Sequence, residues 1–306
     1  MSNKVIIPGG HGFLGQNVVE KLKEHNFDYR AVSRRDGVDF LDFKQTLGLF
    51  EKEKPAMVIN CAAVIGGLQF INQNPGKIFY QNALMNLNLM EAARLSGVKL
   101  YINPLASCSY PGMKREFNEI EWWDGPLHDS VLAYGFTKKM AWVQSWSYEK
   151  EYNFKTTNLI FPNMYGPGDC FDPVRSHALG ALIMKFVDAK EKKLPTVQVW
   201  GDGTPIREWL YVKDAAEVCI KALSIEPVLG PINIGVGQGI SILALAELIK
   251  KNIGYEGQII LDHTKPNGAA SKIMKVDKMK EVFNWEPKTS LEEGIKVTIE
   301  WHRNNR

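Results

Sequence analysis

Short apolar runs alternate along the first half of the chain with longer segments whose apolar residues recur at helical spacing. Four of the short runs are predicted to be strands: residues 4–7, 29–32, 57–64 and 98–102. Residues 4–7 are rich in β-branched side chains, and the near-continuous apolar run 57–64 is typical of a parallel strand covered on both faces. Between the first two runs, Leu14, Val18 and Leu22 recur every four residues and predict a helix; residues 79–95 predict a longer one. Strands that alternate with helices in this way predict an α/β fold built on a doubly wound parallel sheet.

The character of the chain changes near residue 163. A turn-rich stretch, Gly166-Pro167-Gly168, opens this part, and an apolar helical pattern follows over residues 178–190. A chain of 306 residues is long enough for two domains. We therefore predict a first domain over residues 1–165 and a smaller lobe over residues 166–306, and we expect some segments of the second half to return to the first domain.

Composition and charge narrow the range of partners. The 37 basic and 34 acidic residues leave a net charge of +3, too small for a broad attraction to nucleic acid or to a membrane surface. The chain has no apolar stretch of transmembrane length and no signal-peptide pattern, so we expect a cytoplasmic protein without nucleic-acid or membrane partners. Cys61, Cys108, Cys170 and Cys219 lie far apart without zinc-ligand spacing, which predicts reduced thiols and no metal.

The junction between the first strand and the first helix is rich in glycine. Gly9, Gly12 and Gly15 stand three residues apart at this junction. In such a context the first glycine allows a tight turn, the second lets a pyrophosphate approach the backbone, and the third lets helix and strand pack closely. The pattern predicts a dinucleotide site with the phosphates at the helix N-terminus. The alternative is a glycine-rich turn that holds no ligand.

The second predicted strand ends in Ser33-Arg34-Arg35. An NAD-specific site places an acidic residue there for the ribose hydroxyls, whereas arginines suit the 2′-phosphate of NADP. We predict NADPH as the cofactor, with two solvated surface arginines as the alternative. Asp39 has two interpretations, a contact with the adenine edge or the N-cap of the next helix.

Tyr134 and Lys138 stand four residues apart in a predicted helix, which places the phenol and the ammonium on one face. A nearby cation lowers the pKa of a phenol and suits Tyr134 to protonate a carbonyl oxygen that receives hydride. Alone, such a pair is more often a structural tyrosine and a surface lysine. Together with the glycine turn, and with Ser107 and Cys108 on the loop after the fourth strand, it becomes specific.

With these motifs the chain resembles the extended short-chain dehydrogenase/reductase family that acts on nucleotide sugars. The resemblance covers essentially the full length and rests on residues 8–15, 60–67, 107–111, 134–138, 162–167, 176–177, 200–209, 261–268 and 284–294. Within the family, the motifs are most similar to those of epimerase-reductases of GDP-4-keto-6-deoxymannose. The resemblance implies a Rossmann-type sheet with a smaller mixed α/β lobe for the sugar nucleotide, NADPH, a GDP-sugar substrate, and a homodimer formed through the Tyr134 helix and its predecessor.

The resemblance also implies roles for individual residues. Cys108 and His177 would exchange the acidic protons at C3 and C5 of a 4-keto sugar, and Tyr134 with its lysine and Ser107 would serve reduction at C4. The residues implied at the cofactor are Gly9, Gly12, Phe13, Leu14, Gly15, Arg34, Arg35, Asp39, Ala62, Ala63, Lys138, Pro162 and His177. Those implied at the substrate are Asn163, Lys185, Trp200, Arg207 and Lys272.

Three departures from the family pattern bear on the activity. Ala106 stands where a catalytic serine is usual, so either Ser107 fills that role or Tyr134 works without the hydroxyl. Lys185 stands where arginine is frequent, and small residues at 269–270 replace larger polar ones. These differences leave room for a C4-reductase without epimerase activity, acting on a related sugar such as a GDP-6-deoxy-4-keto-heptose. A dinucleotide-binding protein without catalysis is a further alternative, against which the intact tyrosine–lysine pair counts.

Overall fold

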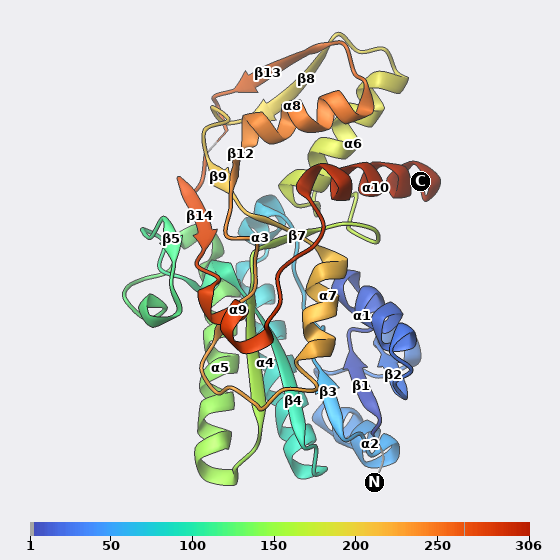
Figure 1. The fold of residues 1–306 in the computed structure, drawn as a ribbon, viewed down its shortest axis with the longest axis vertical. Coiled ribbons are helices and arrows are strands. Elements are labelled where there is room, and N and C mark those ends of the chain that lie inside the picture. The colour runs from blue at the N-terminus through green and yellow to red at the C-terminus, as the bar shows by residue number, and fades with distance from the viewer. Residues whose placement is uncertain (1–2, 266) are drawn as a thin grey trace.

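The computed structural model describes residues 3–265 and 267–306, in a larger lobe built on a parallel sheet and a smaller mixed lobe (Figure 1). Six parallel strands form the central sheet in the order β11-β6-β4-β3-β1-β2. The strands are β1 (Val5–Pro8), β2 (Tyr29–Val32), β3 (Met57–Ile59), β4 (Leu100–Ala106), β6 (Thr156–Phe161) and β11 (Ile232–Asn233). The predicted doubly wound α/β architecture is confirmed.

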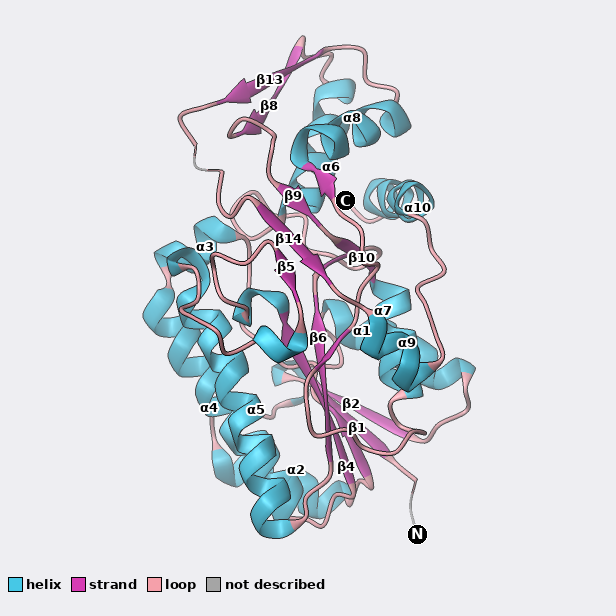
Figure 2. Ribbon diagram, turned by 60° about the vertical axis from the view of Figure 1, so that its left-hand side comes forward, coloured by secondary structure: helices cyan, strands magenta, loops and turns pink. Residues whose placement is uncertain are grey.

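Helices cover both faces of this sheet (Figure 2). One face carries α1 (Phe13–Glu24), α7 (Val212–Lys221) and α9 (Asp277–Phe283); the other carries α2 (Phe43–Glu53), α4 (Pro75–Leu95) and α5 (Leu132–Tyr152). Side chains alternate between the two layers, because Val5 and Ile7 pack on the α1 side and Ile6 packs on the α2 side, all fully buried. Burial on both faces explains why these strands read as continuous apolar runs.

The order in which strands are added to the sheet reverses at β1, which pairs in parallel with β2 on one side and with β3 on the other. Connections leave such a point in opposite directions and open a crevice at the carboxyl ends of the strands. The predicted strand over residues 57–64 is too long, because β3 ends at Ile59. Beyond it, the Asn82 side chain bonds both backbone groups of Val64, at 2.9 and 2.8 Å, in place of a strand partner. Residues 60–64 are thus free to face the crevice.

The smaller lobe has its own apolar core, to which three helices contribute. These are α6 (Ala178–Glu191), α8 (Ile242–Ile253) and α10 (Leu291–Asn304). Short parallel pairs join β8 (Thr196–Trp200) to β13 (Gln258–Asp262) and β7 (Asn163–Tyr165) to β10 (Trp209–Tyr211). A four-stranded sheet contains β12 (Ile240–Ser241), β9 (Ile206–Arg207), β14 (Ser271–Met274) and β5 (Glu116–Phe117), in that order.

The two halves of the sequence exchange segments. From the second half, α7 packs on α1 and β11 extends the central sheet, while β5 from the first half pairs with β14. Short turns complete the fold: α3 (Leu68–Gln73) and the 3-10 helices η1 (Arg34–Asp36), η2 (Ser107–Ser109), η3 (Glu119–Glu121) and η4 (Asp129–Val131). Within the described part of the chain, no helix is long and apolar enough to cross a membrane.

Candidate active site

The glycine turn after β1 is packed too tightly for side chains. Gly9 has φ +74°, and a Cβ there would lie 2.6 Å from the backbone of Cys61 and Ala62. A Cβ at Gly15 would collide with the carbonyl oxygen of Gly9. Helix α1 begins with Gly12 as its N-cap and without a side-chain cap, so its first N–H groups face the turn. This backbone cradle fits the diphosphate of a dinucleotide.

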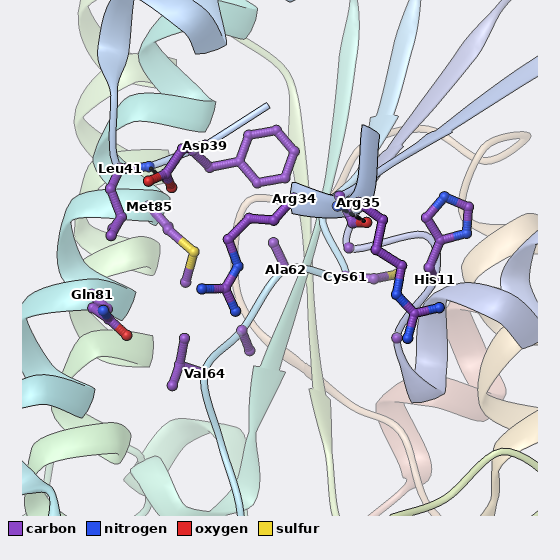
Figure 3. Close-up of a pocket in the computed structure, with 15 residues that line it drawn as sticks. His11, Arg34, Arg35, Asp39, Leu41, Cys61, Ala62, Val64, Gln81 and Met85 are labelled. Carbon is purple, nitrogen blue, oxygen red and sulfur yellow. Dashed lines mark hydrogen bonds between the residues drawn. The ribbon is translucent and has the colours of Figure 1, made fainter. Parts of the chain in front are cut away.

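A cavity of about 260 Å³ opens beside the turn, at the switch point of the sheet (Figure 3). Seven of the residues predicted at the cofactor line it: Gly9, Gly12, Arg34, Arg35, Asp39, Ala62 and Ala63. Two arginines in a cavity that continues from a phosphate cradle fit a phosphorylated ribose. The cavity is the right chemical environment for the adenosine half of NADP.

The remaining predicted cofactor residues do not line this cavity. Leu14 is buried in the apolar core under α1, with Phe13 packed against that core, and Gly15 serves the close contact with the turn. Pro162 lies between β6 and β7. Lys138 in α5 and His177 at the start of α6 are described below. The lining also contains residues that the sequence analysis missed: His11, Ser33, Phe40, Leu41, Cys61, Val64, Gln81 and Met85. Only His11, inside the glycine motif, carried a usable signal.

The structure decides between the two interpretations of Asp39. Helix α2 is capped by Asp42, whose carboxylate accepts from the backbone N–H groups of Lys44 and Gln45 at 2.8 and 3.1 Å. Asp39 lines the cavity and accepts from the N–H of Leu41 at 3.1 Å. The capping alternative for Asp39 is therefore wrong.

Tyr134 and Lys138 occupy adjacent turns of α5 and are both buried. Lys138 Nζ lies 5.5 Å from the Tyr134 ring centroid and donates to the carbonyl oxygen of Pro104 at 2.9 Å. Burial lowers the pKa of Lys138 to about 8, against the opposing charges of Cys108 and Cys61. Burial, with a smaller contribution from Cys108, raises the pKa of Tyr134. The lowered Tyr134 pKa expected from the sequence is wrong for this structure, where the phenol holds its proton firmly.

Cys108 lies at the carboxyl end of β4, against the start of α5. A Cβ on Gly135 would lie 2.5 Å from the carbonyl oxygen of Cys108, so a glycine after the tyrosine lets the two segments touch. Cys108 and Ala106 pack against Tyr134 in one small apolar cluster. Burial raises the pKa of the Cys108 thiol, against the charges of Lys272 and Lys138. Ser107 is buried next to them, and its carbonyl oxygen accepts from the N–H of Tyr110 at 3.1 Å.

His177 is the N-cap residue of α6, in the smaller lobe. Burial lowers the pKa of its imidazole, which is therefore neutral at pH 7. The loop before it contacts the larger lobe, because the N–H of Gly67 donates to the carbonyl oxygen of Arg175 at 2.8 Å. A Cβ on Gly67 would collide with the carbonyl oxygen of Ser176. The segment after β3 thus lies between the Tyr134 cluster, which includes Ile65, and the His177 loop.

The residues predicted at the substrate fall into two groups. Lys272 on β14 and Arg207 on β9 are strand partners, and burial lowers both pKa values. The charge of Lys272 also acts on Cys108, where it opposes the burial that raises the pKa of the thiol. Lys185 and Trp200 form the second group: the ammonium lies 5.5 Å from the indole centroid and donates to the carbonyl oxygen of Gln198 at 3.0 Å. Partly buried cations such as these suit an anionic ligand.

Asn163 supports this region from β7. Its side-chain amide donates to the carbonyl oxygen of Glu208 at 3.3 Å. Glu208, which the sequence analysis did not single out, is fully buried and accepts from three backbone N–H groups, those of Val236, Gly237 and Met274. Its carboxylate ties the Arg207 strand to the strand of Lys272. No group of three or more metal-ligating side chains occurs among residues 3–265 and 267–306.

A phosphate cradle at a sheet switch point, beside a buried tyrosine–lysine pair, defines a Rossmann-type NAD(P)-dependent oxidoreductase. The chain belongs to the NAD dependent epimerase/dehydratase family, whose model matches residues 5–235. The resemblance to extended short-chain dehydrogenases/reductases and the expectation of an NAD(P)-dependent oxidoreductase are both confirmed.

Comparison with individual proteins is consistent with this assignment. The chain is 32% identical to GDP-L-fucose synthase 1 of Arabidopsis thaliana over 99% of its own length and 94% of that protein. A GDP-L-fucose synthetase from Naegleria fowleri, solved with NADP bound, is 29% identical with a TM-score of 0.90, over 99% of this chain and 93% of that one. A GDP-6-OMe-4-keto-L-xylo-heptose reductase from C. jejuni shares the fold, with a TM-score of 0.94 at 24% identity, over 100% of this chain and 99% of that one.

Proposed function

We propose that the protein is an NADPH-dependent epimerase-reductase that acts on a GDP-4-keto-6-deoxy sugar, as in GDP-L-fucose formation. The observation that carries the proposal is the cluster at the carboxyl end of β4, where Cys108 and Tyr134 pack together and Lys138 lies 5.5 Å from the Tyr134 ring centroid. The charges of Lys272 and Lys138 act there against the burial that raises the pKa of Cys108. This set unites groups for proton exchange at carbon with a proton donor for a carbonyl oxygen. Relatives named GDP-L-fucose synthase support the choice of substrate.

The protonation states that burial favours suit the epimerisation. The keto group acidifies the neighbouring C3 and C5 protons, because the carbanion delocalises onto oxygen. Neutral His177 is a base that can take such a proton, and the protonated Cys108 thiol is an acid that can return one to the opposite face. Each inversion moves one proton onto the imidazole and one off the thiol, and proton exchange with solvent returns both groups to their starting states before the next inversion. The charges of Lys272 and Lys138 stabilise the thiolate that remains.

Reduction follows at C4. NADPH supplies the hydride when it is bound. Tyr134 holds a proton at Oη for the ketone oxygen, and Lys138, 5.5 Å from the ring centroid, stabilises the phenolate left after transfer. Arg207 and Lys272, both partly buried, would neutralise the diphosphate of the substrate, while Trp200 with Lys185 forms a separate binding element.

The cofactor preference rests on the larger lobe. Arg34 and Arg35 line the cavity beside the phosphate cradle, where a 2′-phosphate would lie. The NADP-bound relative from Naegleria fowleri supports the same choice.

A reductase without epimerase activity is the second candidate, with a GDP-6-deoxy-4-keto-heptose as the example substrate. Ala106 favours it, because this residue packs against Tyr134 and brings no hydroxyl to the phenol. The methyl group of Ala106 leaves more space beside the phenol for a substrate than a serine side chain that bonds the phenol would leave.

We also propose a homodimer. Helices α4 and α5 lie side by side and expose large apolar side chains: Phe79, Tyr80, Leu87, Leu95, Leu132, Phe136, Val143, Trp146 and Tyr152. An apolar surface of this extent is typical of a protein interface. Trp146→Glu is expected to convert the dimer to a monomer in light-scattering measurements.

The cytoplasmic location stays a prediction.

The decisive experiment is NADPH oxidation with GDP-4-keto-6-deoxymannose in deuterated water, with the product examined by NMR. Oxidation with deuterium at C3 and C5 is expected. Oxidation without deuterium would support the C4-reductase instead. Oxidation only with a GDP-4-keto-heptose would show that the substrate is a heptose. No oxidation with any GDP-4-keto sugar would refute the proposal.

A further inference from the structure

Two side chains join the loops that form one wall of the cofactor cavity. His11 stands in the glycine turn after β1, and Asp36 is the last residue of η1, after β2. His11 Nε2 lies 3.1 Å from Asp36 Oδ2. Figure 3 places the His11 ring near Arg35 on the wall of the cavity. The pair therefore bridges the turn that cradles the diphosphate and the turn that carries both arginines.

The Asp36 carboxylate is committed to protein donors. Besides His11, its Oδ2 accepts from the N–H of Ser33 at 2.8 Å and from the Ser33 hydroxyl at 3.4 Å. Although burial acts to raise it, the pKa of Asp36 is lowered by the Ser33 backbone hydrogen bond and by the charges of His11 and Arg30. The group is thus an anion held directly behind the cavity lining.

An anion in this place matters for cofactor choice. Beyond the second strand of a dinucleotide fold, a carboxylate that is free to turn inward accepts from the ribose 2′-hydroxyl and repels a 2′-phosphate. Asp36 belongs to the same short turn as Arg34 and Arg35, so its orientation decides how much of their positive charge is offset at the ribose. His11 is the donor that reaches it from the opposite loop.

We infer that His11 is a specificity-determining positioning residue, which selects NADPH over NADH by holding the Asp36 carboxylate away from the ribose 2′ position. The inference rests on the proposed use of NADPH. In this inference His11 acts on the cofactor through Asp36, and Arg34 and Arg35 bind the 2′-phosphate of the cofactor.

Calorimetric titration with NADP⁺ and with NAD⁺ tests this without any sugar substrate. His11→Ala is expected to weaken NADP⁺ binding roughly tenfold and to leave NAD⁺ binding unchanged or stronger, because the Asp36 carboxylate, then held by Ser33 alone, is less restrained and its negative charge is no longer compensated by His11. His11→Ala/Asp36→Asn is expected to recover most of the lost NADP⁺ affinity. His11→Gln, which keeps an N–H donor, is expected to retain most of the preference.

The matched control is His25→Ala. His25 pairs with the carboxylate of Glu217 at 3.7 Å, at the far end of α1 and outside the cavity, so its loss is expected to change neither affinity. Thermal unfolding of each variant checks that the fold is kept.

Equal NADP⁺ losses in the single and double variants would overturn the inference, since His11 would then act on the phosphate itself. An unchanged ratio of NADP⁺ to NAD⁺ affinity in His11→Ala would overturn it as well. A wild-type protein that binds NAD⁺ as tightly as NADP⁺ would instead refute the proposed cofactor, and with it the need for a selecting residue.

Discussion

The cofactor cavity and the reaction centre are assembled in contrasting ways. The cavity is built mainly by segments that follow three adjacent strands: the glycine turn after β1, the arginine turn after β2 and residues 61–64 after β3. The reaction centre draws on β4, α5 and β14, and on the His177 loop of the smaller lobe. The cofactor cavity depends on the backbone conformation of the turns next to the sheet. The reaction centre depends on how two lobes dock, so substitutions in the two regions should have separable effects.

The largest effect is expected from Tyr134→Phe. Loss of the phenolic proton should slow NADPH oxidation on the order of a thousandfold, while the ring still fills its buried place beside Ala106 and Cys108. Stopped-flow or steady-state absorbance measures the rate, and calorimetry should find NADP⁺ affinity almost unchanged. A variant that keeps more than a tenth of the wild-type rate would show that Tyr134 is not the proton donor in the reduction.

Cys108→Ser separates the two reactions of the centre. The alcohol is a far weaker acid than the thiol, so deuterium exchange at C3 and C5 should fall roughly a hundredfold. Hydride transfer to a substrate that needs no epimerisation should change much less, because Tyr134 and Lys138 remain. Cys170→Ser is the matched control, since that thiol lies in the loop before His177 and is partly exposed. Equal loss of exchange in both variants would contradict the assignment.

Gly15→Ala tests the cradle on its own. The new methyl group would collide with the Gly9 carbonyl oxygen, so we expect a loss of about 1–3 kcal/mol in the free energy of unfolding and a marked loss of NADP⁺ affinity. Gly48→Ala in α2 is the control, because open space surrounds it, and it should stabilise the helix by about 0.5–1 kcal/mol. Chemical denaturation and calorimetry give both quantities. Unchanged NADP⁺ binding in Gly15→Ala would break the link between this turn and the cofactor.

The smallest effect concerns the pH dependence of stability. Folding lowers the pKa of Lys138 from 10.5 to about 8, so between these values the unfolded chain binds more protons and the free energy of unfolding rises with pH. Lys138→Met removes this term. The stability of the wild type relative to the variant should therefore increase from pH 8 to pH 10.5, as measured by denaturation at several pH values. A constant difference would mean that the ammonium is not desolvated.

Local sequence patterns were sufficient to predict several of the residues that line the cavity. The spacing of Gly9, Gly12 and Gly15 and the pair Arg34-Arg35 reflect backbone sterics and charge over a few residues. Gly9, Gly12 and both arginines line one cavity, and Gly15 packs against the turn beside it. The same patterns misplaced the end of β3. The Asn60 side chain accepts from the N–H of Ala62 at 3.1 Å, and Asn82 of α4 bonds both backbone groups of Val64 in place of a strand partner.

The sequence by itself determined the alternation of strands and helices, the dinucleotide turn and the tyrosine–lysine pair, because each depends on periodicity or on contacts within one or two turns. Tertiary structure decided which distant groups meet. Lys272 reaches Cys108 only because β14 pairs with β5 and β9, and burial at that junction sets the protonation of Cys108, Tyr134 and Lys138. Desolvation is a property of the packed molecule, so no local pattern could have supplied it.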